Sequence, residues 1–339
     1  MPTFCDIAQF LSSQALGSTT LPVNCDLSDK TIIVTGGNTG LGLDAAKHLA
    51  RLGVSYLILA VRNVEKGEKA KGEIAKQTKC HTLIEVWQVD LSNYGSVLSF
   101  AVLVRLQLKR LDGLIPNAGV EKMWFETAED LESTLTVNVI STTLMSCGVL
   151  PKLKETSIKH GTRTNLTIVG SLIHFVAPVQ QLDIPRDQKT FTALSDPKTA
   201  DIAQRYPLSK LMITMLFLEL AQRVEDSRNE GIDGKHQVVV NCVNPGWCGT
   251  ELGRDKTAGL VERISFATIG WTCEKGSKTL VNGVCAGMET CGQFLSECQP
   301  KPCSAYVRSA KGKETRERLW KETTVRISTL SPETAAFVQ

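Results

Sequence analysis

The sequence predicts an α/β fold in which helices cover both faces of one doubly wound parallel sheet. Short, almost continuously apolar runs alternate with helical patterns along the 339 residues, and such runs are typical of strands buried on both faces. A glycine-rich turn joins the first run to the first helical pattern. No internal repeat or low-complexity linker divides the chain, so we expect one domain.

The alternation predicts six strands before residue 245. They are expected at 31–36, 56–61, 83–89, 113–115, 165–169 and 237–243, with a last short strand at 305–308. Apolar residues at three- and four-residue spacing predict the helices between them. These are expected at 41–52, 65–76, 94–109, 128–150 and 207–224, with a further helix at 313–327.

Four segments fall outside this alternation. Residues 1–26 are an N-terminal extension, and residues 311–339 form a C-terminal helix and tail around a domain spanning 27–310. The insertions 172–205 and 247–300 follow the fifth and sixth strands, where the ligand crevice of such a sheet lies. Long loops in a compact domain are more often functional than decorative. We therefore expect a substrate pocket and lid, with surface decoration as the alternative.

Composition and charge argue against several classes of protein. The net charge is +3 and no Lys/Arg-rich block occurs, so nucleic-acid binding is not expected. Eleven cysteines without a Cys-x-x-Cys and five histidines without a paired pattern predict reduced thiols in a cytoplasmic protein, with no metal site. The N-terminus lacks a basic region, and the apolar stretch 211–218 is short, so neither a signal peptide nor a transmembrane segment is expected.

The first turn carries a pattern for binding phosphate. Residues 35–42 read Thr-Gly-Gly-Asn-Thr-Gly-Leu-Gly between the first strand and the first helix. Glycines there let the backbone turn tightly and approach a pyrophosphate, which the helix N-terminus stabilises. No Lys follows, so this is not a P-loop.

The residue after the second strand bears on which dinucleotide binds. An acidic residue there accepts from the ribose of NAD, whereas an Arg pairs with the 2′-phosphate of NADP. This chain places Arg62 there, which favours NADP(H). The alternative is a surface Arg at the start of a charged helix.

Tyr206 and Lys210 stand one helical turn apart and so share a face. A nearby cation favours the phenolate and lowers the pKa of a tyrosine, which would let it exchange a proton with an alcohol or carbonyl. An amphipathic helix with a solvated Lys is the alternative. Pro207 suits the first turn of a helix but not its interior, so the helix either starts near Tyr206 or is kinked there.

In their order, these motifs and several others resemble those of the short-chain dehydrogenases/reductases, a Rossmann-type family. The similarity covers about residues 27–325, and Arg62 with the charged helix after it resembles the retinol-dehydrogenase-like branch and fungal reductases of secondary-metabolite pathways. The other matching residues are Asp90 after the third strand, Asn117 in Asn-Ala-Gly, Asn138 in the following helix, Ser171 after the fifth strand, and Pro245 and Gly246 with Thr250 after the sixth.

The resemblance implies a catalytic set and a cofactor site. Tyr206 would donate the proton, Ser171 would hold the substrate oxygen, Lys210 would tune the tyrosine and bind the nicotinamide ribose, and Asn138 would anchor a water. The implied cofactor is NADP(H). Its binding residues would be Thr35, Gly36, Asn38, Gly40, Leu41, Gly42, Arg62, Asp90, Asn117, Tyr206, Lys210, Pro245, Gly246 and Thr250.

The expected function is therefore an NADPH-dependent reductase, or the reverse dehydrogenase, acting on a lipophilic ketone, aldehyde or alcohol. The apolar substrate is inferred from loop residues Phe175, Val176, Phe191, Trp247, Phe266 and Trp271. Two alternatives stay open: a non-catalytic NADP-binding regulatory or scaffold protein, and a nucleotide-sugar epimerase. Relatives usually dimerise through the helices corresponding to 128–150 and 207–224, so a homodimer is expected.

Overall fold

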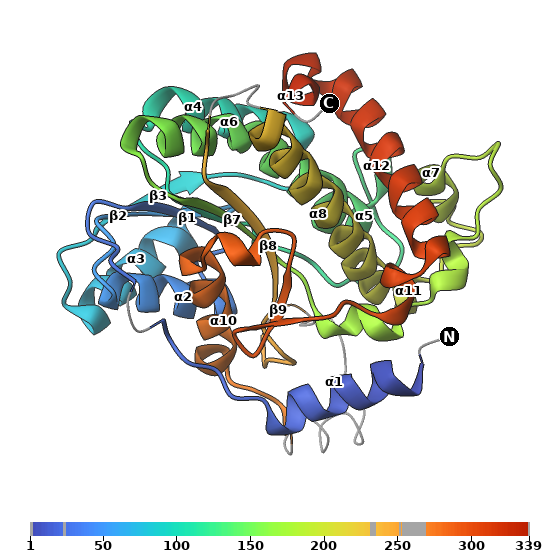
Figure 1. The fold of residues 1–339 in the computed structure, drawn as a ribbon, viewed down its shortest axis with the longest axis horizontal. Coiled ribbons are helices and arrows are strands. Elements are labelled where there is room, and N and C mark those ends of the chain that lie inside the picture. Colours follow the sequence, from blue (N-terminus) through green and yellow to red (C-terminus); the bar gives the residue numbers. More distant parts are fainter. Residues whose placement is uncertain (1–2, 23–24, 231–234, 251, 253–268, 338–339) are drawn as a thin grey trace.

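In a computed structural model, the chain forms one twisted sheet with helices on both faces (Figure 1). The structure describes residues 3–22, 25–230, 235–250, 252 and 269–337. Within these residues the sheet has eight strands in the order β10-β9-β8-β7-β4-β1-β2-β3. Neighbouring strands are parallel except for the antiparallel pair β9 and β10 at one edge. The predicted doubly wound α/β fold is confirmed.

The six strands expected before residue 245 are all present. The sheet consists of β1 (Thr31–Thr35), β2 (Tyr56–Val61), β3 (Leu83–Gln88), β4 (Gly113–Ile115), β7 (Thr164–Val169), β8 (Val238–Asn244), β9 (Phe294–Ser296) and β10 (Gln299–Lys301). A separate ribbon pairs β5 (Thr127–Ala128) with β6 (Leu131–Glu132). Every residue of β1, β4, β7 and β8 is buried, which explains why their sequences are apolar without alternation.

Each face of the sheet carries its own apolar core. On one face lie α2 (Gly40–Arg51), α3 (Val64–Thr78) and α10 (Cys273–Cys285). On the other lie α4 (Tyr94–Gln107), α6 (Thr142–His160) and α8 (Arg205–Glu230), and α12 (Ala310–Leu330) packs on α8 (Figure 1). The chain's own C-terminal helix thus covers part of the surface through which a homodimer was expected to form.

Shorter elements make up the rest of the described residues. The N-terminal extension forms α1 (Phe4–Leu16), which packs against the 3-10 helix η2 (Leu172–Val176). The remaining elements are α5 (Ser133–Leu135), the π-helical turn η1 (Thr136–Ser141), η3 (Val179–Leu182), α7 (Thr190–Leu194), η4 (Ile202–Gln204), η6 (Met288–Thr290), α11 (Ala305–Arg308) and α13 (Pro332–Ala336).

Three expectations about elements are wrong. The stretch 305–308 is the helix α11 rather than a strand, and the last parallel strand is β9. The insertion 247–300 contains α10 and β9, so its second half completes the fold rather than forming a lid. The helix expected at 128–150 starts after a two-stranded ribbon and continues through Pro151 to His160. A three-residue strand offers too short a pattern for the sequence to reveal it.

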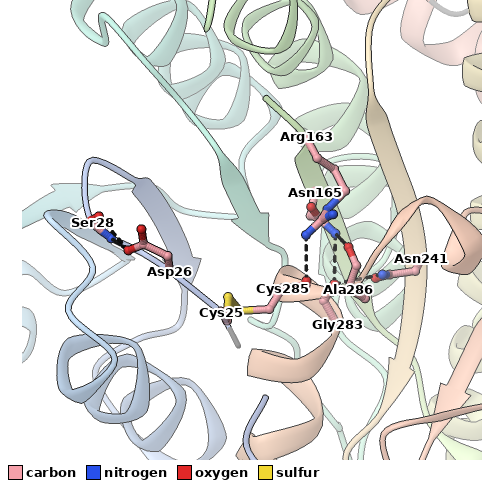
Figure 2. The surroundings of a disulfide bond; sticks show 9 residues. All are labelled: Cys25, Asp26, Ser28, Arg163, Asn165, Asn241, Gly283, Cys285 and Ala286. Carbon is pink, nitrogen blue, oxygen red and sulfur yellow. Dashed lines mark hydrogen bonds between the residues drawn. A yellow bond between two sulfur atoms is a disulfide. The ribbon is translucent and has the colours of Figure 1, made fainter. Parts of the chain in front are cut away.

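One pair of cysteines differs from the expected reduced thiols. Cys25, on the segment between α1 and β1, forms a disulfide with Cys285 at the end of α10 (Figure 2). Their Cα atoms are 6.1 Å apart, within the usual range for a bridge. The two residues are 260 positions apart in the sequence, so no local spacing could reveal the pair.

One described helix is long and apolar enough to cross a membrane by length and composition. It comprises α5, η1 and α6, from Ser133 to His160, and its whole apolar window is buried inside the fold. The expectation that no segment spans a membrane rested on the shorter stretch 211–218. The burial of the longer helix between the sheet and its neighbouring helices accounts for its composition.

Candidate active site

A cavity of about 1650 Å³ lies at the carboxyl ends of the central strands. In an open α/β sheet this edge is where ligands bind. Most of the predicted site residues line it: Gly36, Asn38, Gly40, Leu41, Arg62, Asp90, Asn117, Ser171, Tyr206, Lys210, Pro245, Gly246 and Thr250. The sequence therefore placed these residues, which come from distant parts of the chain, around one cavity.

The turn after β1 has the backbone shape that its glycines allow. Gly36 and Gly40 adopt φ of +65° and +54°, a region that other residues rarely enter. A Cβ on Gly42 would clash with the carbonyl oxygen of Gly36. Gly42 therefore does not line the cavity but lets α2 begin directly beneath the turn. The N-terminus of α2 consequently faces the cavity, as an anion site requires.

Thr35 and Asn117 hold two strand ends together. The Thr35 hydroxyl accepts hydrogen bonds from the backbone N–H groups of Asn117 and Ala118, each at 2.9 Å. The Asn117 side chain in turn donates to the Thr35 carbonyl at 2.9 Å. Thr35 is buried and does not line the cavity, so its hydrogen bonds fix the ends of β1 and β4 rather than offering a contact to a ligand.

Positive charge gathers where the cavity passes the end of β2. Arg62 is exposed and lines the cavity, and so does Lys66, four residues further on. The Asn63 side chain caps α3 by accepting from the Lys66 N–H at 2.8 Å, which fixes the first turn of that helix. The sequence analysis missed Lys66, although its four-residue spacing from Arg62 is a usable signal.

At the opposite end of the cavity, Ser171 begins η2. Its hydroxyl accepts from the Ile173 N–H at 3.2 Å, which leaves the hydroxyl proton able to donate to a bound molecule. The next residue is fixed by Asn244, whose side-chain oxygen accepts from the Leu172 N–H at 2.9 Å. The sequence analysis did not find Asn244, which stands at the end of β8.

His174 connects the same turn at Ser171 to Ser304 through the two nitrogens of its ring. Its Nδ1 lies 2.6 Å from the Ser171 carbonyl oxygen and its Nε2 accepts from the Ser304 N–H at 3.1 Å. A ring that donates at Nδ1 and accepts at Nε2 is neutral. Burial lowers the pKa of His174 to about 4, against the opposing effects of the Ser171 hydrogen bond and the Asp6 charge.

The pH dependence of stability should report on this histidine. An unfolded His binds a proton below about pH 6.5, whereas the folded one resists protonation until about pH 4. The unfolded state therefore binds more protons in this interval, and the contribution of His174 to stability is lost as pH falls through it. In the wild-type protein the free energy of unfolding, measured with urea, should fall as the pH drops between those limits. In His174→Phe we expect this fall to be smaller, by up to roughly 3 kcal/mol. If the free energy of unfolding of the wild type and of His174→Phe changed with pH by the same amount, the prediction would be wrong.

The helix that carries Tyr206 and Lys210 starts immediately before Tyr206. α8 begins at Arg205, so Pro207 falls in its first turn, which decides between the two arrangements that the sequence left open. Lys210 donates from Nζ to the Val169 carbonyl at 2.9 Å, and Nζ lies 5.7 Å from the centre of the Tyr206 ring. Tyr206, Lys210 and Ser171 all line the cavity.

The expected direction of the tyrosine pKa is wrong for the protein alone. Burial raises the pKa of Tyr206 above its ordinary value, and the nearby charge of Glu121 raises it further. Burial also lowers the pKa of Lys210 to about 8. The loss of hydration thus dominates the pKa of the phenol, and the ammonium of Lys210 does not reverse its direction. Tyr206 is therefore a protonated acid across the neutral range.

Asn138 joins two parts of the site without lining the cavity. It stands in the π-helical turn η1, a distortion common at functional sites. Its side-chain oxygen accepts from the Val120 N–H at 2.8 Å, and its nitrogen donates to the Val120 carbonyl at 2.8 Å and the Ser209 hydroxyl at 3.1 Å. It thus ties the loop after β4 to α8 beside Lys210. The water-anchoring role stays a prediction.

A buried ion pair fixes the start of α8. Arg205 and Glu132 have almost no exposed surface, and Arg205 Nε lies 3.5 Å from a Glu132 carboxylate oxygen. Arg205 also donates to the Leu194 carbonyl at 2.6 Å, and the Glu132 carboxylate accepts from the Thr134 and Leu135 N–H groups. The sequence analysis missed this pair because its members are far apart in the chain.

Fewer aromatic residues of the insertions line the cavity than the sequence led us to expect. Phe175, Phe191 and Trp271 are buried in the protein interior, and Phe266 lies outside the described residues. Of the six residues named from the sequence, Val176 and Trp247 line the cavity. Ile173 and Leu252 supply further apolar surface.

Comparison with known proteins shows the family of this chain. The family model described as short chain dehydrogenase matches residues 30–177. A short chain dehydrogenase/reductase of Cryptosporiopsis sp. is 39% identical over 335 residues, which cover 95% of this chain and 98% of that protein. The chain belongs to the short-chain dehydrogenase/reductase family.

This short-chain dehydrogenase/reductase is also similar to other members of the family in sequence and in structure. A short chain dehydrogenase of Emericella nidulans is 38% identical, with 86% of this chain and 90% of that protein covered. Among solved structures, the fold is similar to that of a short-chain dehydrogenase from Sphingobium yanoikuyae in complex with NADPH, with a TM-score of 0.53. That match has 20% identity and covers 75% of this chain and 84% of the other.

Proposed function

We propose that this oxidoreductase uses NADPH to interconvert a ketone or aldehyde with an alcohol on a lipophilic small molecule, as part of fungal secondary metabolism. The observation that carries the proposal is the meeting of Ser171, Tyr206 and Lys210 in one cavity with the glycine turn after β1. The fungal origin of the similar dehydrogenases supports the setting. A cytoplasmic homodimer remains part of the proposal.

The residues of the cavity fit NADP(H). A Cβ on Gly36 would lie 3.2 Å from Ala118 in a strained backbone conformation, so only glycine leaves this surface open for a pyrophosphate. Arg62 and Lys66 would hold the 2′-phosphate, and Asp90 would lie near the adenine. Lys210 would bind the nicotinamide ribose. When bound, the cofactor supplies the hydride.

Residues of the chain would hold the substrate oxygen and supply its proton. Tyr206 is protonated at neutral pH and can donate its proton to the oxygen that becomes the alcohol. The free proton of the Ser171 hydroxyl can hold the same oxygen in place. The apolar side chains of Ile173, Val176 and Trp247 suit a lipophilic substrate and exclude water.

Removing the charge of Arg62 tests the choice of cofactor. A hydrogen bond to a charged group is worth about 1.5–3 kcal/mol, so Arg62→Ala should weaken NADPH binding by roughly 10- to 100-fold and leave NADH binding nearly unchanged. Both affinities can be measured by titration of cofactor fluorescence. Arg51→Ala is a matched control, because it removes the same charge from an exposed residue that does not line the cavity. A wild-type preference for NADH would refute the proposal.

A further inference from the structure

Gln14, in the N-terminal helix α1, contacts the turn that follows β8. Its side-chain oxygen accepts from the Trp247 N–H at 2.8 Å, and its nitrogen lies 3.3 Å from the Trp247 carbonyl oxygen. The same nitrogen donates to the Ile269 carbonyl at 2.6 Å. The amide thus pairs with Trp247 as a neighbouring strand would, and also reaches the segment before Trp271. Only 2% of Gln14 is exposed.

The backbone of Gln14 adds a second link to the same turn. Its carbonyl accepts from the Trp271 indole N–H at 2.8 Å. The backbone of Trp271 donates to the Trp247 carbonyl at 2.8 Å, and its ring lies directly against Gly246, where a Cβ would come within 2.6 Å of it. Gly246 has a φ of +77°, a backbone conformation that favours glycine. Gln14 therefore holds both the turn and the ring that packs on it.

The helix that carries Gln14 is itself firmly attached. At its start, Asp6 is buried and accepts from the Ala305 N–H at 3.0 Å. After its end, the disulfide between Cys25 and Cys285 ties the following segment to α10, the helix that begins just after Trp271 (Figure 2). An attachment at each end lets α1 act as a fixed support rather than a loose extension.

The turn lies at the reactive end of the cavity. Pro245, Gly246 and Gln14 line the cavity together with Ser171 and Tyr206. Arg62 stands after β2, which is separated from β8 in the sheet by β7, β4 and β1. A dinucleotide whose 2′-phosphate meets Arg62 must therefore place its nicotinamide near the turn that Gln14 holds.

We propose that Gln14 is a positioning residue for the nicotinamide end of the cofactor, acting through the turn at Pro245–Cys248. This inference rests on the proposed function. Gln14 would not contribute to binding of the adenosine end, because its contacts are to residues beyond β8. Glutamate in its place could still accept from the Trp247 N–H, but it would lose the donor and face two carbonyl oxygens.

Two ligands that share the adenosine end can show whether Gln14 positions the nicotinamide end or only supports the fold as a whole. NADPH carries both ends, whereas 2′,5′-ADP carries the 2′-phosphate and adenosine without nicotinamide. In Gln14→Ala and Gln14→Glu we expect the affinity for NADPH, measured by calorimetry, to fall about tenfold or more, as loss of one or two hydrogen bonds implies. The affinity for 2′,5′-ADP should stay within about twofold of the wild-type value.

Gln9→Ala is the matched control. Gln9 is an amide on the same helix that contacts the Pro302 carbonyl and not the turn, so its removal should leave both affinities unchanged. If Gln14→Ala does not fold, Trp271→Phe removes the indole donor to Gln14 while keeping a ring against Gly246. It should lower the affinity for NADPH alone.

The outcomes distinguish this inference from the proposed function. Equal losses for both ligands, or no loss for NADPH, would overturn the role of Gln14 while leaving the NADP(H) site intact. Failure of the wild-type protein to bind 2′,5′-ADP would overturn both. A selective loss of NADPH binding in the Gln14 variants would establish that the N-terminal extension completes the reactive end of the site.

Discussion

Tyr206→Phe is expected to reduce turnover by about 10²- to 10⁴-fold, which is the usual contribution of a positioned proton donor. Only the hydroxyl is lost, and the ring keeps its place in the first turn of α8 beside Lys210. The affinity for NADPH should therefore change little. The measurement is NADPH oxidation with a panel of lipophilic ketones and aldehydes, together with a binding titration.

Tyr306→Phe serves as the control for this experiment. It also removes one phenol hydroxyl, which contacts Thr315, from a residue that does not line the cavity, and it should retain full activity. Full activity of Tyr206→Phe would refute the role given to Tyr206. A wild-type protein that binds NADPH but reduces nothing in the panel would favour the regulatory or scaffold alternative.

Loss of the Glu132 carboxylate should produce the largest change in stability. Glu132→Leu removes the buried carboxylate that pairs with Arg205 and leaves the guanidinium buried, with its hydrogen bond to the Leu194 carbonyl. Breaking a buried ion pair from one side typically costs about 3–5 kcal/mol. We expect a decrease of that size in the free energy of unfolding measured with urea. Turnover should fall as well, because Arg205 immediately precedes Tyr206.

A double-mutant cycle shows whether the cost comes from the unpaired charge. Adding Arg205→Met to Glu132→Leu should recover part of the lost stability, because the second change removes the stranded cation. Purely additive losses would show that the two side chains do not act as a pair. Lys69→Ala breaks the exposed pair with Glu65 and should cost less than about 1 kcal/mol.

Local patterns were sufficient for the six strands before residue 245 and for most of the predicted site residues that line the cavity. Each motif lies directly after a buried strand, and parallel strands bring their carboxyl ends to one edge, so the order of motifs determined their meeting place. Gly36, Ser171 and Tyr206 could be placed on that basis. The glycine turn also follows from residues that are neighbours in the chain, whereas the place of Pro207 in the first turn of α8 was decided by the structure.

Contacts between distant segments were not predictable from one sequence. Arg205 with Glu132, Gln14 with Trp247, and Cys25 with Cys285 each join parts of the chain without any shared spacing. The pKa of Tyr206 was misjudged for a related reason. Its direction depends on burial, which is a property of the assembled fold rather than of the four-residue spacing to Lys210.

The attachment of α1 also bears on how the protein is made. Chains are synthesised from the N-terminus and tend to fold in that order, yet the partners of α1 lie at residues 247, 269, 271 and 305. The full set of these contacts can therefore form only after residue 305 has been synthesised. The apolar side chains of Phe4, Ile7 and Leu11 stay exposed even in the finished fold. This helix, which precedes β1 in the sequence, is thus attached only after the last strands of the sheet have been made.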